Sequence, residues 1–494
     1  MKFSYRYKLK PTTKQKTTLI EWLNLCRRQY NFRLGERFRW WESTRTSITS
    51  CPLNVSVVPV DRIYQNIPEF RTQIRDGRKL GDDGQPITKK GDKHPNIVNG
   101  YVNWLTVQLA DLKNTKKLFP EYKQIHSQVL QDVIGRVETA FSNFIKPDKN
   151  GNRAGKPRFK GLHYYKSLTY SQLKNKHIES DGVNLPGIGK VKAVFHRPIP
   201  TGFIVKLGTV KLEADGWYIS LALEDKSVPQ VDEKICPTIE NSIAIDVGLE
   251  RFLTRDDGSY VEIPRFLRKS AARMSRLQHR KSKLPNGSKD KQKLHKVIAK
   301  LHQKIARQRR NFHFATAYKL FEKADAVFVE DLKLKNLIRR NKPQRSSRFA
   351  TDAPAGGAWG VSPAADRRLT TTREPCSRSE NGKFVPNGQS SSSGMNKSWL
   401  DAAHGAFIQI LEWVAWKLGK SVVKVDPWGT SQFCHACLDR VPKTLSDRWH
   451  SCACGASCQR DENSAKIQKL VGLGLALRKT APRGKMAFTP MPAF

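Results

Sequence analysis

Hydrophobic and polar residues alternate at the start of the chain and again near its middle. The first alternating run covers residues 3–9 and ends before Pro11, and the second extends from about 186 to 226. Inside the second run, Asp215-Gly216 precedes an apolar stretch and is typical of a tight hairpin turn. A period of two indicates strands with one buried face. We therefore expect a small β-barrel built from the N-terminal strand and the strands before residue 226.

Between these strands, apolar residues recur at the spacing of amphipathic helices. The first helix is expected to begin after Thr12 or Thr13, because a hydroxyl there can accept hydrogen bonds from the free amides of the first turn. Its apolar face comprises Leu19, Trp22, Leu23, Cys26 and Tyr30. A second helix is indicated from Leu130 to Phe144. We expect these helices to form an insertion, about residues 12–185, in a barrel domain of residues 1–240.

A different pattern begins at residue 242. Apolar runs at 242–246 and 326–330 predict buried strands, and shorter strands are expected at 252–254 and 260–263 around a turn at Asp257-Gly258. A meander of this kind opens the ribonuclease-H-like fold. Later elements are a heptad-like helix or helical hairpin over 268–310, a helix with a buried face from Leu400 to Leu418, and a strand at 421–427. The chain is thus expected to be a multidomain α/β protein.

Composition narrows the partners of the protein. The chain has 494 residues, 88 Lys+Arg and 44 Asp+Glu, which gives a net charge of +44. The length predicts two to four domains. A surplus of positive charge this large repels itself unless a polyanion neutralises it, which favours a nucleic-acid partner and argues against a small-molecule substrate. The alternative, a basic structural protein such as a ribosomal one, is usually much shorter and lacks buried carboxylates.

Three segments concentrate this charge. Residues 268–310 hold 16 Lys+Arg and one acid, Asp290, so we expect this helical segment to face nucleic acid. The stretch 146–160 mixes turn formers, cations and Phe159, which suits single-stranded or folded RNA but also occurs in solvated loops. The cations of the first helix, including Arg33 and Arg37, predict either a solvated face or a face that contacts phosphates.

Other segments lack a regular pattern. Residues 341–393 are rich in Ser, Ala, Gly, Pro and Arg, so an insertion or disordered loop is expected there, and an irregular tail is expected at 476–494. No run of eighteen apolar residues predicts a membrane span, and residues 1–10 are a strand pattern instead of a signal peptide. Five of the nine cysteines lie between Cys434 and Cys458, which indicates metal binding in a reducing compartment. We expect a cytoplasmic, nucleoid-associated protein of a prokaryote.

Three acidic residues are the candidate catalytic groups. Asp246 and Glu330 each end an apolar strand, and Asp461 opens a helix-like segment. Strand alternation places Glu330 beside Phe328 and leaves Asp331 on the opposite face, which favours Glu330 as a ligand. Each acid alone could be a turn residue or a helix cap. Together they predict a Mg²⁺ or Mn²⁺ site for cutting nucleic acid, because these hard ions prefer carboxylate oxygens.

The clustered cysteines predict a second metal site. Cys434-His-Ala-Cys437 is a knuckle of the kind that binds Zn²⁺, which requires four ligands in a closed site. The second half is one residue shorter than the usual Cys-x-x-Cys, and we expect Cys452 and Cys454 to complete the set, with Gly455 allowing the turn. Cys458, His435 and His450 are the alternative ligands. A closed zinc site is structural, and here it would hold the segment that carries Asp461.

These segments resemble the transposon-encoded TnpB family, the OrfB-type transposase-associated proteins that are ancestors of type V CRISPR effectors. The resemblance lies in Tyr5-Arg-Tyr-Lys-Leu-Lys-Pro11, Lys156-Pro-Arg-Phe-Lys160, Ala244-Ile-Asp246-Val-Gly-Leu249, Val329-Glu330-Asp-Leu332, Asn396-Lys-Ser, Asp426-Pro-Trp-Gly-Thr-Ser-Gln432-Phe-Cys434 and Arg460-Asp461-Glu-Asn463-Ser-Ala465. It covers nearly the whole chain except 341–393 and the tail. It implies a wedge-like N-terminal β-barrel with a helical recognition insert, followed by a RuvC-like nuclease domain of the ribonuclease-H fold with an inserted zinc ribbon. The implied bounds are 241–433 for the first part of the nuclease domain, 434–458 for the zinc ribbon and 459–475 for the final helix.

The resemblance also implies an activity. Members of this family are RNA-guided DNA endonucleases, in which a guide RNA made from the end of the element pairs with double-stranded target DNA. Carried over by motif, Asp246, Glu330 and Asp461 hold catalytic Mg²⁺ (or Mn²⁺), and four cysteines hold Zn²⁺. Those cysteines are Cys434, Cys437, Cys452 and Cys454. The shortened Cys-x-Cys and the inserted 341–393 segment depart from the family pattern.

Three other readings compete with this one. A compact type V CRISPR effector would share the fold and the chemistry. A transposase that acts by strand transfer usually orders its acids Asp, Asp, Glu, whereas the order here is Asp246, Glu330, Asp461. A cleavage-dead RNA-guided DNA-binding protein would not need all three acids, so their presence favours an active enzyme.

Overall fold

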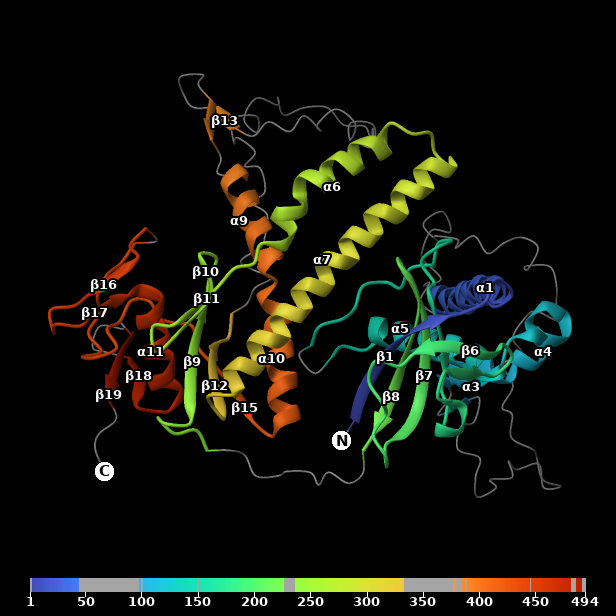
Figure 1. Ribbon diagram of the computed structural model, residues 1–494, viewed down its shortest axis with the longest axis horizontal. Helices are drawn as coiled ribbons and strands as arrows, with labels where there is room; N and C mark the ends of the chain where they lie inside the picture. The colour runs from blue at the N-terminus through green and yellow to red at the C-terminus, as the bar shows by residue number, and fades with distance from the viewer. Residues whose placement is uncertain are drawn as a thin grey trace, which may run out of the picture. The chain divides into compact units, whose positions relative to one another are not determined.

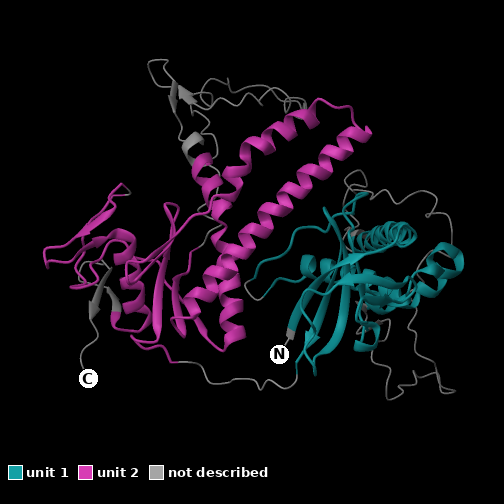
Figure 2. Ribbon diagram, in the orientation of Figure 1, with its two compact units in different colours: residues 1–230 teal, residues 231–494 magenta. Residues whose placement is uncertain are grey.

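The computed structural model describes residues 2–43, 97–98, 101–148, 151–225, 236–332, 376–378, 384–386, 389–444, 446–480 and 486–490. The chain divides into two compact units, residues 1–230 and 231–494 (Figure 2). Most of the insertion expected at 341–393 lies outside the described residues. None of the helices that are described has the length and apolar character needed to span a membrane.

A six-stranded antiparallel sheet forms the centre of the first unit (Figure 1). Its order is β4-β7-β8-β1-β6-β5. The strands are β1 (Lys2–Lys10), β4 (Ser167–Tyr170), β5 (Gly182–Leu185), β6 (Gly189–Val194), β7 (Ile204–Glu213) and β8 (Gly216–Glu224). The expected pairing of the N-terminal strand is confirmed, because Tyr5 lies opposite Leu221, and β7 and β8 form the expected hairpin.

The sheet differs from the expectation in two ways. β4 and β5 are its edges, so within the described residues the strands form a curled open sheet and do not close into a barrel. These two strands also lie inside the range 12–185 that was expected to be helical. Each is only four residues long, too short for a period of two to stand out from the surrounding turns.

Helices pack against this sheet. They are α1 (Thr13–Ser43), α3 (Trp104–Ala110), α4 (Leu112–Leu118), the 3₁₀ helix η3 (Pro120–Gln124) and α5 (Ser127–Ile145), and a short hairpin of β2 (Ile97–Val98) and β3 (Tyr101–Val102) precedes them. Trp22 of α1, Val133 of α5 and Tyr7 of β1 are fully buried in one core. Both expected helices are confirmed, and α1 continues well beyond Tyr30.

Two cations of α1 are not part of the phosphate-facing surface that the sequence left open, whereas Arg28 and Arg39 are exposed. Arg33 is buried and pairs with Glu36 at 2.9 Å and Asp111 at 2.5 Å, and Arg37 pairs with Glu138 at 2.6 Å. Buried arginines require partners of this kind, since an unpaired buried charge is strongly destabilising. These two cations therefore connect α1 to its neighbouring helices instead of facing solvent.

The second unit is built on a five-stranded mixed sheet with the order β11-β10-β9-β12-β15. The strands are β9 (Ser242–Val247), β10 (Arg251–Arg255), β11 (Tyr260–Glu262), β12 (Ala326–Glu330) and β15 (Ser421–Val425). β9, β10 and β11 are antiparallel neighbours, whereas β12 pairs parallel with both β9 and β15. The strands expected from the apolar runs are all present.

Helices cover both faces of this sheet (Figure 1). They are α7 (Lys289–Phe321), α10 (His404–Leu418) and α11 (Arg460–Gly472). Ile245 and Val329 point to α7 and α10, whereas Ala244 and Phe328 pack against Ala465 of α11. The predicted alternation is thus confirmed, and it places the side chains of positions 246 and 330 on the α11 side.

The basic segment forms a helical hairpin of α6 (Phe266–Ser282) and α7, joined through a core that includes Met274, Ile298 and Ile305. The helix expected from Leu400 to Leu418 is divided in two, because Ala403 takes a left-handed conformation between α9 (Gln389–Ala402) and α10. The break moves Leu400 off the buried stripe, so it is 56% exposed.

The expectation of an irregular tail from residue 476 is wrong. β18 (Ala476–Thr480) pairs with β19 (Met486–Pro490) in an antiparallel hairpin. Two strand-forming runs flank Pro482-Arg-Gly484, but each run is too short to predict a strand from spacing alone. A further pair of short strands, β13 (Cys376–Arg378) and β14 (Phe384–Pro386), lies within the segment that was expected to be a loop.

Gly472 lets α11 approach the sheet. A Cβ atom at this position would lie 2.2 Å from Cδ1 of Phe328, a ring that is fully buried. Gly472→Ala is therefore expected to destabilise the packing of α11 by about 1–3 kcal/mol, the usual cost of overpacking a core. Faster amide hydrogen exchange in α11 would report this loss.

Gly394→Ala provides the matched control for that substitution. Gly394 also lies in a helix of the second unit, and a Cβ atom there would contact nothing within 4 Å. This variant should be neutral or stabilising by about 0.5–1 kcal/mol, because alanine favours a helix more than glycine does. Equal exchange rates in the two variants would show that the Phe328 contact does not limit the position of α11.

Candidate active site

Asp246 and Glu330 are brought together by the parallel pairing of their strands. Val329 of β12 lies opposite Ile245 of β9, so the next residue of each strand carries a carboxyl group on the α11 face of the sheet. Glu330 is the last residue of β12 and Asp246 the penultimate residue of β9. Both side chains are half-buried. Asp331, on the opposite side of the strand end, is exposed.

Asp461 reaches the same region from the first turn of α11. This helix packs across β9, β10, β12 and β15. Two contacts fix its position over the strands: Lys469 Nζ pairs with Asp256 Oδ2 at 2.8 Å, and the hydroxyl of Ser464 hydrogen bonds to Asp246. The structure thus assembles the three acids that the sequence analysis singled out, although they lie far apart along the chain.

The electrostatics show that the three carboxyls interact. Burial raises the pKa of Asp246 well above its usual range, and the neighbouring Glu330 and Asp461 raise it further, against Arg460 and Ser464. Burial also raises the pKa of Glu330, while a hydrogen bond from Thr430 opposes the rise and Asp461 adds to it. Carboxylates that share a partly buried site disfavour each other's ionised form. The site is therefore stabilised by a proton or by a cation.

Thr430 and Arg460 lie directly against these acids. Thr430 is buried, and its Oγ1 donates a hydrogen bond to Glu330 Oε1 at 2.6 Å. Arg460 pairs with Asp461 at 3.4 Å, and it also donates to the main-chain oxygen of Asp447 at 3.1 Å. Both residues lie within motif segments of the sequence, at 426–434 and 460–465, but their residue types alone indicate no role there.

The four cysteines chosen as zinc ligands converge on one point. The Sγ atoms of Cys434, Cys437, Cys452 and Cys454 all lie within 4.8 Å of one another. Cys434 Sγ is 3.6 Å from Cys454 Sγ, and Cys437 Sγ is 3.5 Å from Cys452 Sγ. Tetrahedral zinc with Zn–S bonds of about 2.3 Å requires sulfur atoms roughly 3.8 Å apart, so the donor set fits this ion.

The shortened second half is accommodated by a tight turn. Gly455 has a φ of +92°, a conformation that favours glycine, and the main-chain N–H of Cys452 donates to Ala456 O at 3.0 Å. Cys458 lies outside the four-sulfur group, on β17 (Ser457–Gln459) opposite His450 of β16 (Trp449–Ser451). Cys434, His435 and His450 form a second set of potential ligand atoms within 4.8 Å of one another.

Asn463 connects the cysteine cluster to α11. Its Oδ1 accepts from the main-chain N–H of His435 at 3.1 Å and faces the His435 Nδ1 at 2.9 Å, and its Nδ2 donates to Phe433 O at 2.7 Å. Asn463 is fully buried and lies two residues after Asp461. The sequence alone does not indicate a function for Asn463, although the residue lies in the segment Arg460-Asp461-Glu-Asn463.

Comparisons with known proteins match the segments of the chain that contain these residues. A family model described as "Probable transposase" matches residues 227–341, one described as "Cas12f1-like, TNB domain" matches 404–467, and a "Helix-turn-helix domain" model matches 1–46. The described part of that last range is a strand and one long helix. The second model spans α10, β15, the cysteine cluster and Asp461.

Two relatives and one solved structure extend the comparison. A putative RNA-guided DNA endonuclease of Streptomyces pristinaespiralis is 23% identical over 372 residues, which cover 74% of this chain and 76% of the relative. The putative RNA-guided DNA endonuclease InsQ of Escherichia coli (strain K12) is 28% identical over 217 residues, 44% of this chain and 51% of the relative. A cryo-EM structure of a Cas12f1-sgRNA-target DNA complex aligns with 14% identity and a TM-score of 0.38, over 95% of this chain and 98% of that one.

The match to the probable-transposase model at 227–341 falls on the segment that carries Asp246 and Glu330, and the match over 404–467 falls on the segment that carries the four cysteines and Asp461. The relative of Streptomyces pristinaespiralis extends the likeness over 74% of the chain. The chain is thus similar, segment by segment, to proteins described as probable transposases and to putative RNA-guided DNA endonucleases.

Proposed function

We propose that this protein is an RNA-guided DNA endonuclease encoded by a transposable element, with Asp246, Glu330 and Asp461 as its catalytic acids. The observation that carries the proposal is the assembly of these three acids at one edge of a sheet. There Glu330 and Asp461 raise the pKa of Asp246, and Asp461 raises the pKa of Glu330. Both curated relatives bear the name of this activity. The strand order, with α11 across one face, supports a RuvC-like centre of the ribonuclease-H fold.

The acids fit divalent cations of the hard type. They offer only oxygen donors, and their mutual repulsion is relieved when a cation replaces bound protons. Within the described residues, no three carboxylates have oxygens all within 4.8 Å of one another, so their spacing is wider than that of the cysteines. Bound Mg²⁺ or Mn²⁺, held by the oxygens of these acids, would supply an activated water and stabilise the leaving oxygen.

The residues of the chain supply the positions for this chemistry. Asp246 and Glu330 stand on rigid paired strands, and α11 holds Asp461 against them through Ser464 and the Lys469–Asp256 pair. Thr430 orients the carboxylate of Glu330. Sequence choice would lie with base pairing between the guide RNA and the target strand, while the protein binds backbone phosphates through its cations.

We further propose that the four cysteines bind a structural Zn²⁺, in a ribbon at 434–458 inserted before the last nuclease helix. A closed four-thiolate site supplies no chemistry of its own. Its role would be to fix Phe433 and His435, the residues that Asn463 contacts, and so to fix the start of α11. The first unit, with its curled sheet and helices, would recognise guide and target.

Two measurements test the proposed activity together. RNA that co-purifies with the protein from its host is sequenced, and the protein with that RNA is incubated with plasmids that carry a matching target. The expected result is a guide derived from the end of the element and Mg²⁺-dependent plasmid cleavage only where the guide matches. If the plasmids stayed intact under all metal and guide conditions, the nuclease proposal would be wrong. A guide encoded in a CRISPR array would favour a compact type V CRISPR effector.

Thr430→Val should weaken cleavage without removing it. Valine keeps the shape of threonine but cannot donate to Glu330 Oε1. Groups that orient metal-binding carboxylates typically contribute about 10–100-fold in metal affinity or activity. We therefore expect cleavage by Thr430→Val to require a higher Mg²⁺ concentration, measured as a titration of rate against Mg²⁺.

Thr430→Ser is the conservative control, since serine retains the hydroxyl. It should restore the Mg²⁺ requirement of the natural protein to within a few-fold. A purely structural role for Thr430 would instead change the thermal stability of both variants and leave the Mg²⁺ midpoint where it was.

A further inference from the structure

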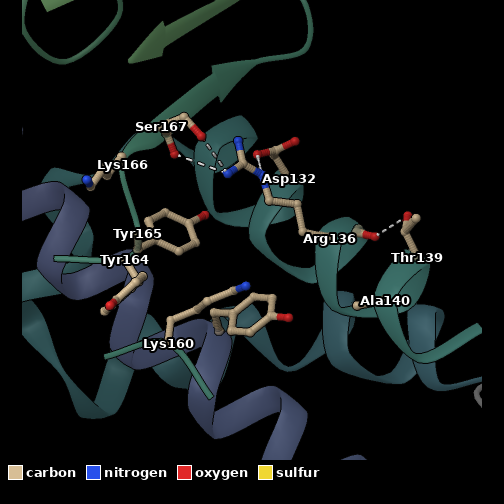
Figure 3. A pocket seen from close by; sticks show the side chains of 11 residues that line it. Asp132, Arg136, Thr139, Ala140, Lys160, Tyr164, Tyr165, Lys166 and Ser167 are labelled. Carbon is tan, nitrogen blue, oxygen red and sulfur yellow. Dashed lines mark hydrogen bonds and ion pairs between the residues drawn. The ribbon is translucent and has the colours of Figure 1, made fainter. Parts of the chain in front are cut away.

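A pocket of the first unit lies apart from the acids and the cysteines. It has a volume of about 520 Å³, and its lining comes from α1, α5 and residues 160–167 (Figure 3). The lining combines aromatic rings, cations and a carboxylate. Its principal members are Tyr30, Asp132, Arg136, Lys160, Tyr164 and Tyr165. The stretch 146–160, whose composition suits single-stranded or folded RNA, leads into this pocket.

The main chain at Lys160 is held in place from both sides. Its N–H donates to Asn31 Oδ1 at 2.7 Å, and Asn31 Nδ2 donates to Lys160 O at 3.0 Å. These bonds fix the backbone of Lys160 to α1, and the side chain of Lys160 lines the pocket. Its Nζ lies 5.5 Å from the centroid of the Tyr30 ring, so a cation stands next to an aromatic face.

Arg136 organises the opposite side of the pocket. Its Nε pairs with Asp132 Oδ2 at 2.7 Å, and its terminal nitrogens donate to Ser167 Oγ at 2.9 Å and Thr169 Oγ1 at 2.8 Å. The guanidinium also lies 5.3 Å from the centroid of the Tyr165 ring. Since protein groups already engage Arg136, it serves to fix Asp132 and Tyr165 at the pocket wall.

The hydroxyl group of Tyr165 is buried without a hydrogen-bond partner among the described residues. The side chain of Tyr165 is buried as a whole, with 8% of the residue exposed. Figure 3 shows this hydroxyl on the side where Arg136 and Lys160 lie. A buried hydroxyl is costly unless it is paired, so a ligand that offers a polar edge here would be favoured.

Tyr164 presents an aromatic ring to solvent. The residue is 81% exposed, although it lines the pocket. It follows a turn in which the N–H of Tyr164 donates to Gly161 O at 3.0 Å and His163 takes a φ of +146°. A non-glycine residue in that region is strained, and such strain is concentrated at functional sites.

We propose that this pocket binds an unpaired nucleotide of RNA, with its base stacked on Tyr164 and its phosphate close to Lys160. Exposed aromatic rings beside cations are the usual platform for single-stranded nucleic acid. Asp132 and Tyr165 offer an acceptor and a hydroxyl to the base edge or to the ribose 2′-hydroxyl, which distinguishes RNA from DNA. That the bound RNA is a guide rests on the proposed function, whereas the binding of a nucleotide by this pocket is argued from its own residues.

Photo-crosslinking of the full-length protein tests the site. A single-stranded RNA with one 4-thiouridine is irradiated with the protein, and the crosslinked peptides are identified by mass spectrometry. We expect a crosslink within 160–167, and a fall of about tenfold in its yield for Tyr164→Ala, since one base–aromatic stack is worth about 1–3 kcal/mol. Tyr164→Trp should retain the yield because the indole also stacks.

Leu162→Ala is the matched control. Leu162 is 57% exposed on the same turn but does not line the pocket, so its variant should crosslink like the natural protein. Crosslinks that avoid 160–167, or equal losses for Tyr164→Ala and Leu162→Ala, would overturn the proposal. Equal crosslinking of a DNA strand of the same sequence would overturn its assignment to RNA.

A further arm separates this proposal from the nuclease proposal. Asp246→Asn should crosslink normally because residue 246 lies in the other unit. Cleavage without a crosslink in the pocket would leave the nuclease standing and remove the nucleotide site. A crosslink in the pocket without any cleavage would do the reverse.

Discussion

Asp246→Asn is expected to abolish Mg²⁺-dependent DNA cleavage and to raise the thermal stability of the metal-free protein at neutral pH. Asparagine has the shape of aspartate but no charge, so it removes a cation ligand without leaving a cavity. The activity should fall by at least roughly 10²–10³-fold, the range seen when a preorganised electrostatic group is lost. Stability should rise because the substitution relieves repulsion among three neighbouring carboxyls.

The sign of the pH dependence follows from the raised pKa of Asp246. Its folded pKa lies well above the ordinary value of 3.8, so the folded state holds the proton more tightly than the unfolded state does. The resulting stabilisation is complete below that ordinary value and is lost as the pH rises through the raised pKa. The melting temperature of the natural protein in a chelator should therefore fall over this window more steeply than that of Asp246→Asn.

Added Mg²⁺ should make the melting temperature of the natural protein higher than that of Asp246→Asn, the reverse of their order in a chelator. A ligand that binds only the folded state stabilises it by mass action. Mg²⁺ is expected to raise the melting temperature of the natural protein and to have little effect on Asp246→Asn. If Asp246→Asn melted below the natural protein in a chelator, the three carboxyls would not destabilise the metal-free protein by repelling one another.

Glu330→Gln and Asp331→Asn form the matched pair for the second acid. The two positions are adjacent at the end of β12, but Glu330 faces the other acids whereas Asp331 is exposed. Glu330→Gln should abolish cleavage like Asp246→Asn, and Asp331→Asn should cleave like the natural protein. Loss of cleavage in both variants would mean that the face assignment is wrong.

The strands and most helices could be predicted because each depends on a local pattern. A period of two or of 3.6 is visible within one element, and Glu330 could be preferred to Asp331 from alternation alone. The break at Ala403 could not be predicted, since the residue that takes the left-handed conformation is an alanine, a residue type that favours helices. The strand edges of the first sheet were missed for a related reason: whether a sheet closes depends on partners distant in sequence.

Some residues of the candidate site could likewise be predicted from the sequence, and others could not. The acids and cysteines are few in type, and their spacing is specific enough to select them from sequence. Thr430 and Asn463 act through single hydrogen bonds to Glu330 and His435, and a threonine or asparagine has many other common roles. Only the three-dimensional arrangement shows which partners these side chains contact.

Cys437→Ser is expected to remove zinc from the protein and to reduce cleavage, although Cys437 has no contact with the catalytic acids among the interactions described. Its Sγ belongs to the four-sulfur cluster, where serine is a poor replacement for a thiolate. Zinc content should fall from about one ion per chain to near zero, because a closed site needs all four ligands. Cleavage should fall about 10–100-fold, as is typical when support of a metal site is lost.

Cys458→Ala distinguishes the two candidates for the fourth ligand. Cys458 is buried on β17 outside the cluster, so this variant should keep its zinc, whereas Cys454→Ser should lose it. The opposite pattern of zinc content would make Cys458 the ligand and show that the short Cys-x-Cys does not close the site.

The coupling between zinc and catalysis should run through Asn463. Asn463→Ala removes the bonds to Phe433 and His435 but none of the four sulfurs, so it should retain zinc and still lose activity. Hydrogen exchange at the start of α11 should accelerate in both Asn463→Ala and Cys437→Ser. If exchange there stayed slow in Cys437→Ser while cleavage fell, zinc would support the enzyme by another route. Slow exchange with normal cleavage would mean that packing of α11 on the sheet, with Ala465 and Gly472 against Phe328, suffices to hold Asp461 in place.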